Sequence, residues 1–309
     1  MPAFGANPGA LRMLRYVPAG LPPGAPLVVV LHGCSQTAAS YDTGTGWSTL
    51  AERHGFALLL PEQRRANNAH GCFNWFEPGD TARGEGEVAS IRSMIAHMVV
   101  DHRLDQQRIY ITGLSAGGAM TAAMLATYPD LFAGGAIIAG LPYRAAVNTK
   151  DALAAMFHCR SLPAPVWGDL VRNAGPAPRR YPTIAIWHGD ADTTVTPGNA
   201  LESAKQWDRR AWPARSRWGR RPRRGRSAPG LAGSRRRGEG GTLRHSRPGP
   251  WHADRYGRAG RSRRGARHAV HPGIERVLDV AHRPELGPGR GQPRHCAGQI
   301  AGAGPDEPS

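Results

Sequence analysis

The stretch Arg108–Met124, RIYITGLSAGGAMTAAM, decides how this chain folds. Its β-branched run IYIT is typical of a buried strand, and the Ala- and Met-rich segment after Ser115 predicts a helix. The turn between them must be GLSAG, residues 113–117, which is a G-x-S-x-G nucleophile elbow. Glycines suit both ends of so tight a turn because a side chain there would collide with backbone. We therefore expect Ser115 to project a nucleophilic hydroxyl beside helix N-terminal amides that could stabilise an oxyanion; the alternative is a plain turn with an idle serine.

Apolar runs on either side of the elbow predict the rest of a sheet. Continuous apolar runs are typical of central parallel strands, and 3-and-4 spacing of apolar residues is typical of helices that cover a sheet. Strands are expected at 11–17, 26–31, 56–61, 134–140 and 183–187, and helices at 47–54, 87–101 and 199–207. Short helices and loops from Leu141 to about Arg180 resemble a cap insertion. The fold class is α/β, a mostly parallel sheet with helices on both faces.

A glycine-containing loop follows the predicted strand PLVVVL. It reads His32-Gly33-Cys34-Ser35-Gln36, and Gly33 lets backbone approach a tetrahedral oxygen closely. In enzymes with this elbow, the corresponding loop supplies a second oxyanion amide. The candidate donor is the amide of Cys34 or of Ser35. The alternative is an ordinary exit from a strand, with a buried histidine.

An aromatic cluster, CFNWF, lies in the polar loop 67–80. Loops beside strand ends line active sites, so Trp75, together with Tyr143 after the strand at 134–140, could form a substrate wall. A hydrophobic lid packed on the domain explains the aromatic cluster equally well.

A carboxylate follows the last predicted strand, in HGDADTTV. Hydrolases with the elbow carry their triad in the order serine, acid, histidine, and the acid orients the imidazole. Asp192 is the expected acid, and Asp190 is expected to be a turn former that satisfies local amides.

Composition divides the chain in two. Residues 208–309 hold 24 Arg, no Lys and 8 acidic residues, a net charge of +16, whereas residues 1–207 carry +1 of the total +17. The basic character therefore belongs to the tail. The expected domains are a catalytic domain at 7–207 and an Arg-, Gly- and Pro-rich tail of low order at 208–309.

The sequence lacks the patterns of a membrane span, a secretory signal and a zinc site. No apolar run reaches the 18 residues that indicate a membrane span, and the start, MPAFGANPGALRMLRYVP, lacks the pattern of a secretory signal. The four cysteines show no CxxC spacing, which argues against zinc. We expect no metal, no cofactor and no membrane partner; the oligomeric state cannot be read from the sequence.

The motifs LHGCSQTA, PEQRRANN, CFNWF, TGLSAGGAM, ATYPDLFAGGAIIAGLPY and WHGDADTTV, spread from about Asn7 to Trp207, together resemble the polyhydroxybutyrate depolymerase type of serine esterase. This is a secreted α/β-hydrolase group related to feruloyl and acetylxylan esterases. The resemblance implies Ser115 as nucleophile, Asp192 as acid, and amides of Cys34 and Ala116 in the oxyanion hole. It further implies a Cys34–Cys72 disulfide, which would need an oxidising compartment; the alternative is two reduced, buried cysteines. Polymeric or small esters are the implied substrates, and the implied location is extracellular.

The resemblance stops after about residue 207. Such esterases need a late histidine in a Gly-x-x-His-Gly-Thr-Pro context, and the sequence has none. Only 274–280 in the tail carries a pattern typical of a strand or helix, so the fold should be truncated at its C-terminal end. The histidines of the tail at 245, 252, 268 and 271 lie on no predicted strand or capped loop, and the catalytic histidine is unknown.

A change of reading frame would explain this tail. One permitted set of codons for residues 230–255, translated one base later, gives VWRDRAGEARVERCAIPGLAHGTPI, which contains the missing histidine loop. The pair Trp251-His252 forces Gly and then Thr or Met in that frame, whatever codons are used. We hypothesise a frame shift near Asp208, and resequencing the gene tests it.

Other functions compete with the depolymerase interpretation. A feruloyl or acetylxylan esterase has the same chemistry, and the aromatic loop could stack on a ferulate ring. A dead pseudoenzyme is the alternative that loss of the histidine suggests. The arginines would attract polyanions, but they lack helical spacing and stacking platforms, so we expect no specific nucleic-acid binding.

Overall fold

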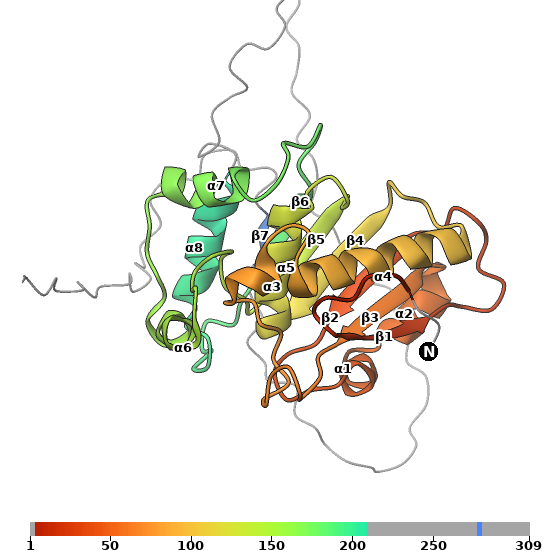
Figure 1. Cartoon of the computed structure of the whole chain (residues 1–309), viewed down its shortest axis with the longest axis horizontal. Helices are drawn as coiled ribbons and strands as arrows, with labels where there is room; N and C mark the ends of the chain where they lie inside the picture. Colours follow the sequence, from red (N-terminus) through yellow and green to blue (C-terminus); the bar gives the residue numbers. More distant parts are fainter. Residues whose placement is uncertain (1–3, 209–276, 280–309) are drawn as a thin grey trace, which may run out of the picture. The chain divides into compact units, whose positions relative to one another are not determined.

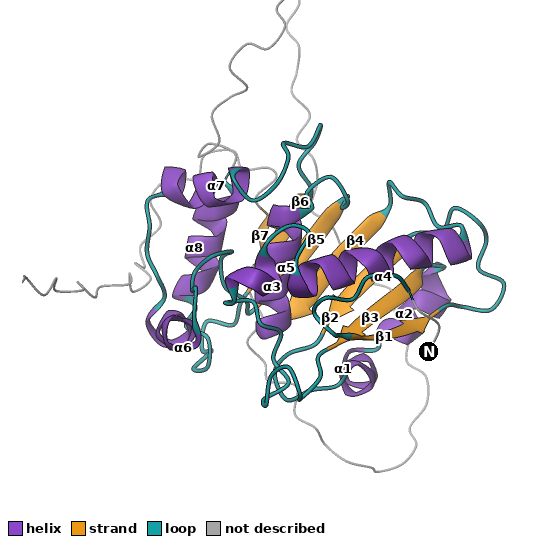
Figure 2. Ribbon diagram, in the orientation of Figure 1, coloured by secondary structure: helices purple, strands orange, loops and turns teal. Residues whose placement is uncertain are grey.

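A seven-stranded sheet organises the part of the chain that the computed structural model describes, residues 4–208 and 277–279 (Figures 1 and 2). Its order is β1-β3-β2-β4-β5-β6-β7. The strands are β1 Arg12–Tyr16, β2 Leu27–Leu31, β3 Ala57–Glu62, β4 Ile109–Leu114, β5 Gly134–Ile138, β6 Thr183–Trp187 and β7 Val277–Asp279. The strands from β3 to β6 are parallel, whereas β1 and β7 are antiparallel to their neighbours. The predicted α/β fold with a mostly parallel sheet is confirmed.

Parallel pairing brings the carboxyl ends of the central strands to one edge of the sheet. Leu31 is paired with Gly113, Leu114 with Ile138, and Ile138 with Trp187. Loops that leave these four strand ends therefore start side by side. The serine loop after β4 and the acid loop after β6 are two of them.

Helices cover both faces, because apolar runs such as LVVVL bury side chains on each side. Leu27, Val29 and Leu31 belong to one apolar cluster with residues of α4 and α5, while Val30 belongs to another with residues of α1 and α2. Figure 2 shows α4 and α5 lying across one face of the strands. The helices are α1 Ala38–Thr45, α2 Trp47–His54, α3 Pro78–Thr81, α4 Gly86–His102, α5 Ala116–Thr127, α6 Thr149–His158, α7 Ala164–Arg172 and α8 Gly198–Trp207.

The segment between β5 and β6 is attached to α8 through a buried carboxylate. Glu202 of α8 is 3% exposed and accepts hydrogen bonds from Trp167 Nε1 at 2.8 Å, Ser161 Oγ at 3.0 Å and the Leu162 amide at 3.3 Å. Lys205 Nζ forms an ion pair with it at 2.6 Å. The short helices expected here are α6 and α7, and this carboxylate fixes α7 and the loop before it to the helix that follows β6.

The sheet does not end at β6, as the expected C-terminal truncation would require. The three-residue β7 lies within 274–280, the segment of the tail that carried a pattern, and pairs with the last three residues of β6. The predicted disorder after about residue 208 otherwise falls on residues outside those described. Within the described ranges, no helix has both the length and the apolar character needed to cross a membrane.

Candidate active site

Ser115 occupies a strained turn between β4 and α5. Its backbone lies at φ 56° and ψ −117°, a region that residues other than glycine seldom adopt, and its side chain is partly exposed. The Ser115 amide donates to the Ile138 carbonyl at 2.9 Å, which fixes the turn to the end of β5. The hydroxyl thus stands at the carboxyl edge of the sheet and at the N-terminus of α5, the geometry of a nucleophile elbow.

The glycines of the elbow permit close approach of three backbone segments. A Cβ at Gly113 would lie 2.3 Å from the Gly117 carbonyl oxygen, and a Cβ at Gly117 would lie 2.3 Å from that of Leu31 in β2. Both contacts are with backbone, so no change of rotamer could relieve them. Any side chain at these positions would push the elbow away from β2.

The loop after β2 passes beside the serine. A Cβ at Gly33 would lie 3.6 Å from Ser115 Cβ. The Ser35 amide already donates to the His70 carbonyl at 2.8 Å, whereas no described residue accepts from the Cys34 amide. Amides in the first turn of a helix, Ala116 among them, also lack intrahelical acceptors. This arrangement favours Cys34 over Ser35 as partner of Ala116 in an oxyanion hole.

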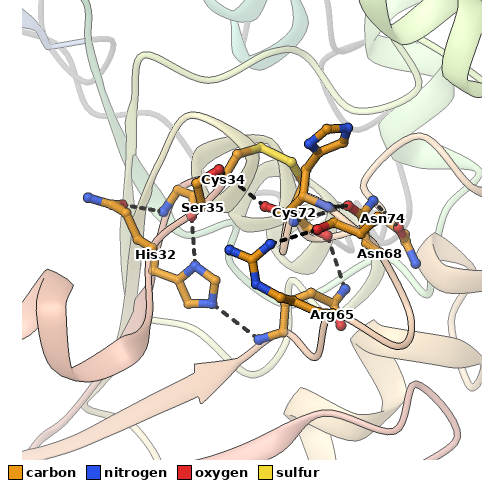
Figure 3. The surroundings of a disulfide bond; sticks show 12 residues. His32, Cys34, Ser35, Arg65, Asn68, Cys72 and Asn74 are labelled. Atoms are coloured by element: carbon orange, nitrogen blue, oxygen red, sulfur yellow. Dashed lines mark hydrogen bonds between the residues drawn. A yellow bond between two sulfur atoms is a disulfide. The ribbon is translucent and has the colours of Figure 1, made fainter.

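A disulfide joins the loop after β2 to the loop after β3. Cys34 and Cys72 are bonded, 38 residues apart in sequence (Figure 3). The Cys72 carbonyl accepts from Gln63 Nε2 at 3.1 Å, and the Cys72 amide donates to Asn68 Oδ1 at 3.3 Å. The disulfide therefore fastens the aromatic loop to the candidate oxyanion loop, and the amide side chains of Gln63 and Asn68 hold the backbone of Cys72.

His32 connects the same two loops from inside the protein. It is 1% exposed, with Nδ1 2.8 Å from the Gly33 carbonyl oxygen and Nε2 3.1 Å from the Gln63 amide. A backbone N–H can only donate, so Nε2 accepts and the ring proton lies on Nδ1. Burial lowers the pKa of His32, which keeps the imidazole neutral.

A buried carboxyl group supports the far side of the aromatic loop. Glu87 of α4 is fully buried, and it accepts from the Asn74 amide at 3.0 Å and from Gln63 Nε2. Burial and the nearby Asp80 raise the pKa of Glu87 well above its usual value. Sequence reasoning missed this contact, and a glutamate early in an amphipathic helix gives little signal of it.

Asp192 is held by the backbone of its own turn. Oδ1 accepts from the amides of Thr194 at 2.9 Å and Val195 at 3.0 Å, while Oδ2 lies 3.4 Å from His188 Nε2. His188 Nε2 also lies 2.8 Å from the Val195 carbonyl oxygen. Asp190 is exposed. The carboxylate of Asp192 is thus oriented in advance, as the acid of a triad must be.

The serine and the acid leave the same edge of the sheet. The Ala139 amide donates to the Trp187 carbonyl at 2.8 Å, next to the bond between Ser115 and Ile138. One strand lies between β4 and β6, so their ends are about 10 Å apart. That separation of the strand ends is compatible with the proposed serine and acid contributing to one site.

Comparison with known proteins bears on this geometry. The family model described as Esterase PHB depolymerase matches residues 13–222. The chain belongs to this family. It is 49% identical over 209 residues to poly(3-hydroxyalkanoate) depolymerase C of Paucimonas lemoignei, covering 66% of this chain and 49% of that protein. The chain thus spans about half the length of that depolymerase.

Two further similar proteins are a feruloyl esterase and an acetyl xylan esterase by name. Feruloyl esterase B of Neurospora crassa is 35% identical over 213 residues, covering 66% of this chain and 71% of that protein. The solved acetyl xylan esterase from Aspergillus awamori superposes with a TM-score of 0.62 at 27% identity, covering 67% of this chain and 77% of that one. The α/β-esterase fold is therefore shown, and the family's members are esterases.

The two aromatic residues expected to form a substrate wall are mostly packed inside. Trp75 is 6% exposed and meets Phe76 edge to face, with ring centroids 5.4 Å apart. Tyr143 is 5% exposed, and its amide donates to Gln206 Oε1 at 2.8 Å. Such burial favours the alternative of an aromatic loop packed on the domain, and the substrate wall stays a prediction.

Three further predictions concern histidines and metal ligands. The tail histidines at 245, 252, 268 and 271 lie outside. No group of three or more His, Cys, Asp or Glu in the described ranges is arranged to hold a metal. Sequence reasoning gave His32 only as a possible buried histidine, because its two bonds depend on where the loop after β3 passes.

Removing the disulfide should lower stability. For the double variant Cys34→Ser/Cys72→Ser, we expect the free energy of unfolding to fall by about 3 kcal/mol, because the bond closes a long loop in the unfolded chain. Urea titration followed by tryptophan fluorescence measures it. Reductant added to the double variant controls for effects elsewhere. An unchanged urea midpoint would mean that the bond does not form.

Proposed function

We propose that this chain is a serine-nucleophile carboxylic ester hydrolase of the PHB depolymerase type. The observation that carries the proposal is the strained, partly exposed Ser115, with the loop after β2 so close that a Cβ at Gly33 would lie 3.6 Å from Ser115 Cβ. Ser115 Oγ would attack the ester carbonyl while a base takes its proton, and the oxyanion would bind those amides. The alcohol then leaves with a proton, and water cleaves the acyl-enzyme. Asp192 would orient the imidazole that serves as base.

Short-chain polyhydroxyalkanoate and its oligomers are the substrates that we propose. The identity of 49% to a poly(3-hydroxyalkanoate) depolymerase supports this choice. A feruloyl or acetylxylan ester is the alternative, supported by the relatives that bear those names. The Cys34–Cys72 disulfide suits an oxidising compartment, which supports an extracellular location.

We further propose that catalysis by the chain as it stands is impaired. The sequence contains no Gly-x-x-His-Gly-Thr-Pro segment to supply the base, and the hypothesised change of frame near Asp208 would explain why. Without its base a serine hydrolase keeps only the contribution of its oxyanion hole and of substrate binding. A catalytically dead pseudoenzyme is the limiting form of this proposal.

A fluorophosphonate probe tests the nucleophile. In the presence of imidazole as a diffusible base, we expect phosphonylation of the peptide that contains Ser115, detected by mass spectrometry, and none in Ser115→Ala. Ser35→Ala is the matched control: this exposed serine lies on the neighbouring loop, and its loss should leave labelling intact. Labelling of Ser115→Ala at the wild-type rate would contradict the proposal.

The substrate class needs its own comparison. We compare the rate of clearing of a polyhydroxybutyrate suspension with the rate of ferulate release from methyl ferulate. Both rates are measured with imidazole present, and the rate of Ser115→Ala is subtracted from each. Faster clearing of the polyester supports the first substrate. Ferulate release alone would establish the alternative.

A further inference from the structure

We propose that His32 is a positioning residue that directs the Cys34 N–H toward the oxyanion. The inference rests on the proposed function, because the Cys34 amide matters for catalysis only if Ser115 attacks an ester. His32 itself touches neither substrate nor serine in this proposal. It acts through the single peptide group that joins Gly33 to Cys34.

The argument starts from the geometry of that peptide group. The carbonyl that His32 Nδ1–H binds, at 2.8 Å, and the candidate oxyanion donor belong to the same planar unit, Gly33 C=O and Cys34 N–H. The described residues contain no cis peptide bond, and in a trans peptide the C=O and N–H point in opposite directions. A bond that holds the carbonyl oxygen on the inner side therefore holds the N–H on the outer side.

His32 can hold the carbonyl firmly because the ring itself is fixed. Nε2 accepts from the Gln63 amide at 3.1 Å, which sets the tautomer and leaves the proton on Nδ1. Phe73 packs on the ring, with centroids 4.8 Å apart, and both side chains are buried. Figure 3 shows the imidazole between the two loops, with both nitrogens engaged. Every polar atom of the ring is thus used.

The opposite orientation of this peptide would be harmful. If the Gly33–Cys34 peptide turned over, its carbonyl oxygen would face the serine and repel a developing negative charge. The backbone amide of Gln36 also binds the Gly33 carbonyl oxygen, but at 3.3 Å, against 2.8 Å for His32 Nδ1. Without His32, this longer bond alone would oppose the rotation of the peptide. The Cys34–Cys72 bond fastens the side chain of Cys34 and does not directly hold the preceding peptide. His32 supplies the shorter of the two hydrogen bonds that hold its carbonyl.

Two substitutions by amide residues distinguish the roles of the two ring nitrogens of His32. In His32→Asn the side-chain amide stands close to the position of Nδ1, so it can still donate to the Gly33 carbonyl. In His32→Gln it reaches the position of Nε2, where its oxygen accepts from the Gln63 amide and the Gly33 bond is lost. Both variants bury a neutral amide in place of the ring, so their thermal stabilities form a matched pair.

The expected kinetic result concerns kcat. With p-nitrophenyl butyrate and imidazole, after subtraction of the Ser115→Ala rate, we expect His32→Gln to lose about 10²-fold in kcat with little change in KM. His32→Asn should keep most of kcat. Phe73→Leu, which removes the stacked ring and keeps both bonds, should lower Tm and spare kcat. Equal losses in His32→Asn and His32→Gln would overturn the proposal and leave His32 a packing residue.

A spectroscopic readout decides the point without catalysis. In protein labelled with ¹⁵N-cysteine, the Cys34 amide resonance should move in His32→Gln and stay near its place in His32→Asn, with the Cys72 amide as internal reference. Imidazole ¹⁵N shifts should show His32 protonated on Nδ1. A wild-type chain without Ser115-dependent hydrolysis would defeat the proposed function alone; an unmoved Cys34 resonance in His32→Gln, or a proton on Nε2, would defeat the role of His32.

Discussion

Restoring the reading frame after about residue 207 should raise kcat for ester hydrolysis by about 10⁴-fold or more. The reason is the base: the chain has the proposed nucleophile Ser115 and the proposed acid Asp192, but it lacks the histidine segment that would transfer the proton between serine and leaving group. Loss of a triad member in serine hydrolases costs on this scale, and its return should recover the same factor. One permitted set of codons around Trp251 and His252 supplies HGTP in the shifted frame.

The measurement compares the chain as it stands with one translated from a gene shifted by one base near codon 208. Initial rates on p-nitrophenyl butyrate give kcat for both. Replacing the restored histidine by alanine should return the rate to that of the present chain, and Ser115→Ala should remove the gain altogether. A restored chain that gains nothing, while remaining folded, would show that the frame change is not the cause of impairment.

The sequence predicted the central sheet well because its signals are local. Apolar runs such as PLVVVL and FALLLP predict buried strands wherever they lie, and the structure has β2 and β3 there. α1 was missed because AASYDTGT has no apolar face. Its start is marked instead by Thr37 and Ser40, each of which binds the other's backbone amide in a capping box. That signal was present in the sequence and was not used.

The details of the site depend on the paths of loops. Cys34 and Ser35 could not be distinguished in the sequence, because the Ser35 amide is occupied by a carbonyl from another loop, that of His70. The burial of Trp75 and Tyr143 is likewise decided by which helices pack against them. A pattern of residues along one segment carries no information on such contacts. The boundary between the domains at 207 and 208 stays a prediction, because residues 209–276 lie outside those described.

Gly117→Ala should strongly destabilise the protein by displacing the elbow. The added methyl would lie 2.3 Å from the Leu31 carbonyl oxygen and 2.5 Å from that of His32, so either α5 or β2 must move. Overpacking in a close-packed core costs about 3 kcal/mol or more when only backbone can yield. Because α5 is fully buried and β2 is a central strand, the displaced elements have nowhere to relax. We expect a large fall in Tm, measured by differential scanning calorimetry.

Gly44→Ala is the matched control, since Gly44 is also a helical glycine. Nothing lies within 4 Å of a Cβ there, and the residue is exposed in α1, so alanine should raise stability by about 0.5–1 kcal/mol through its better helix propensity. The opposite signs of two identical substitutions separate the geometry of the elbow from the general effect of replacing glycine. If Gly117→Ala kept the wild-type Tm, the close approach of α5 to β2 would be absent, and with it the strain that presents Ser115.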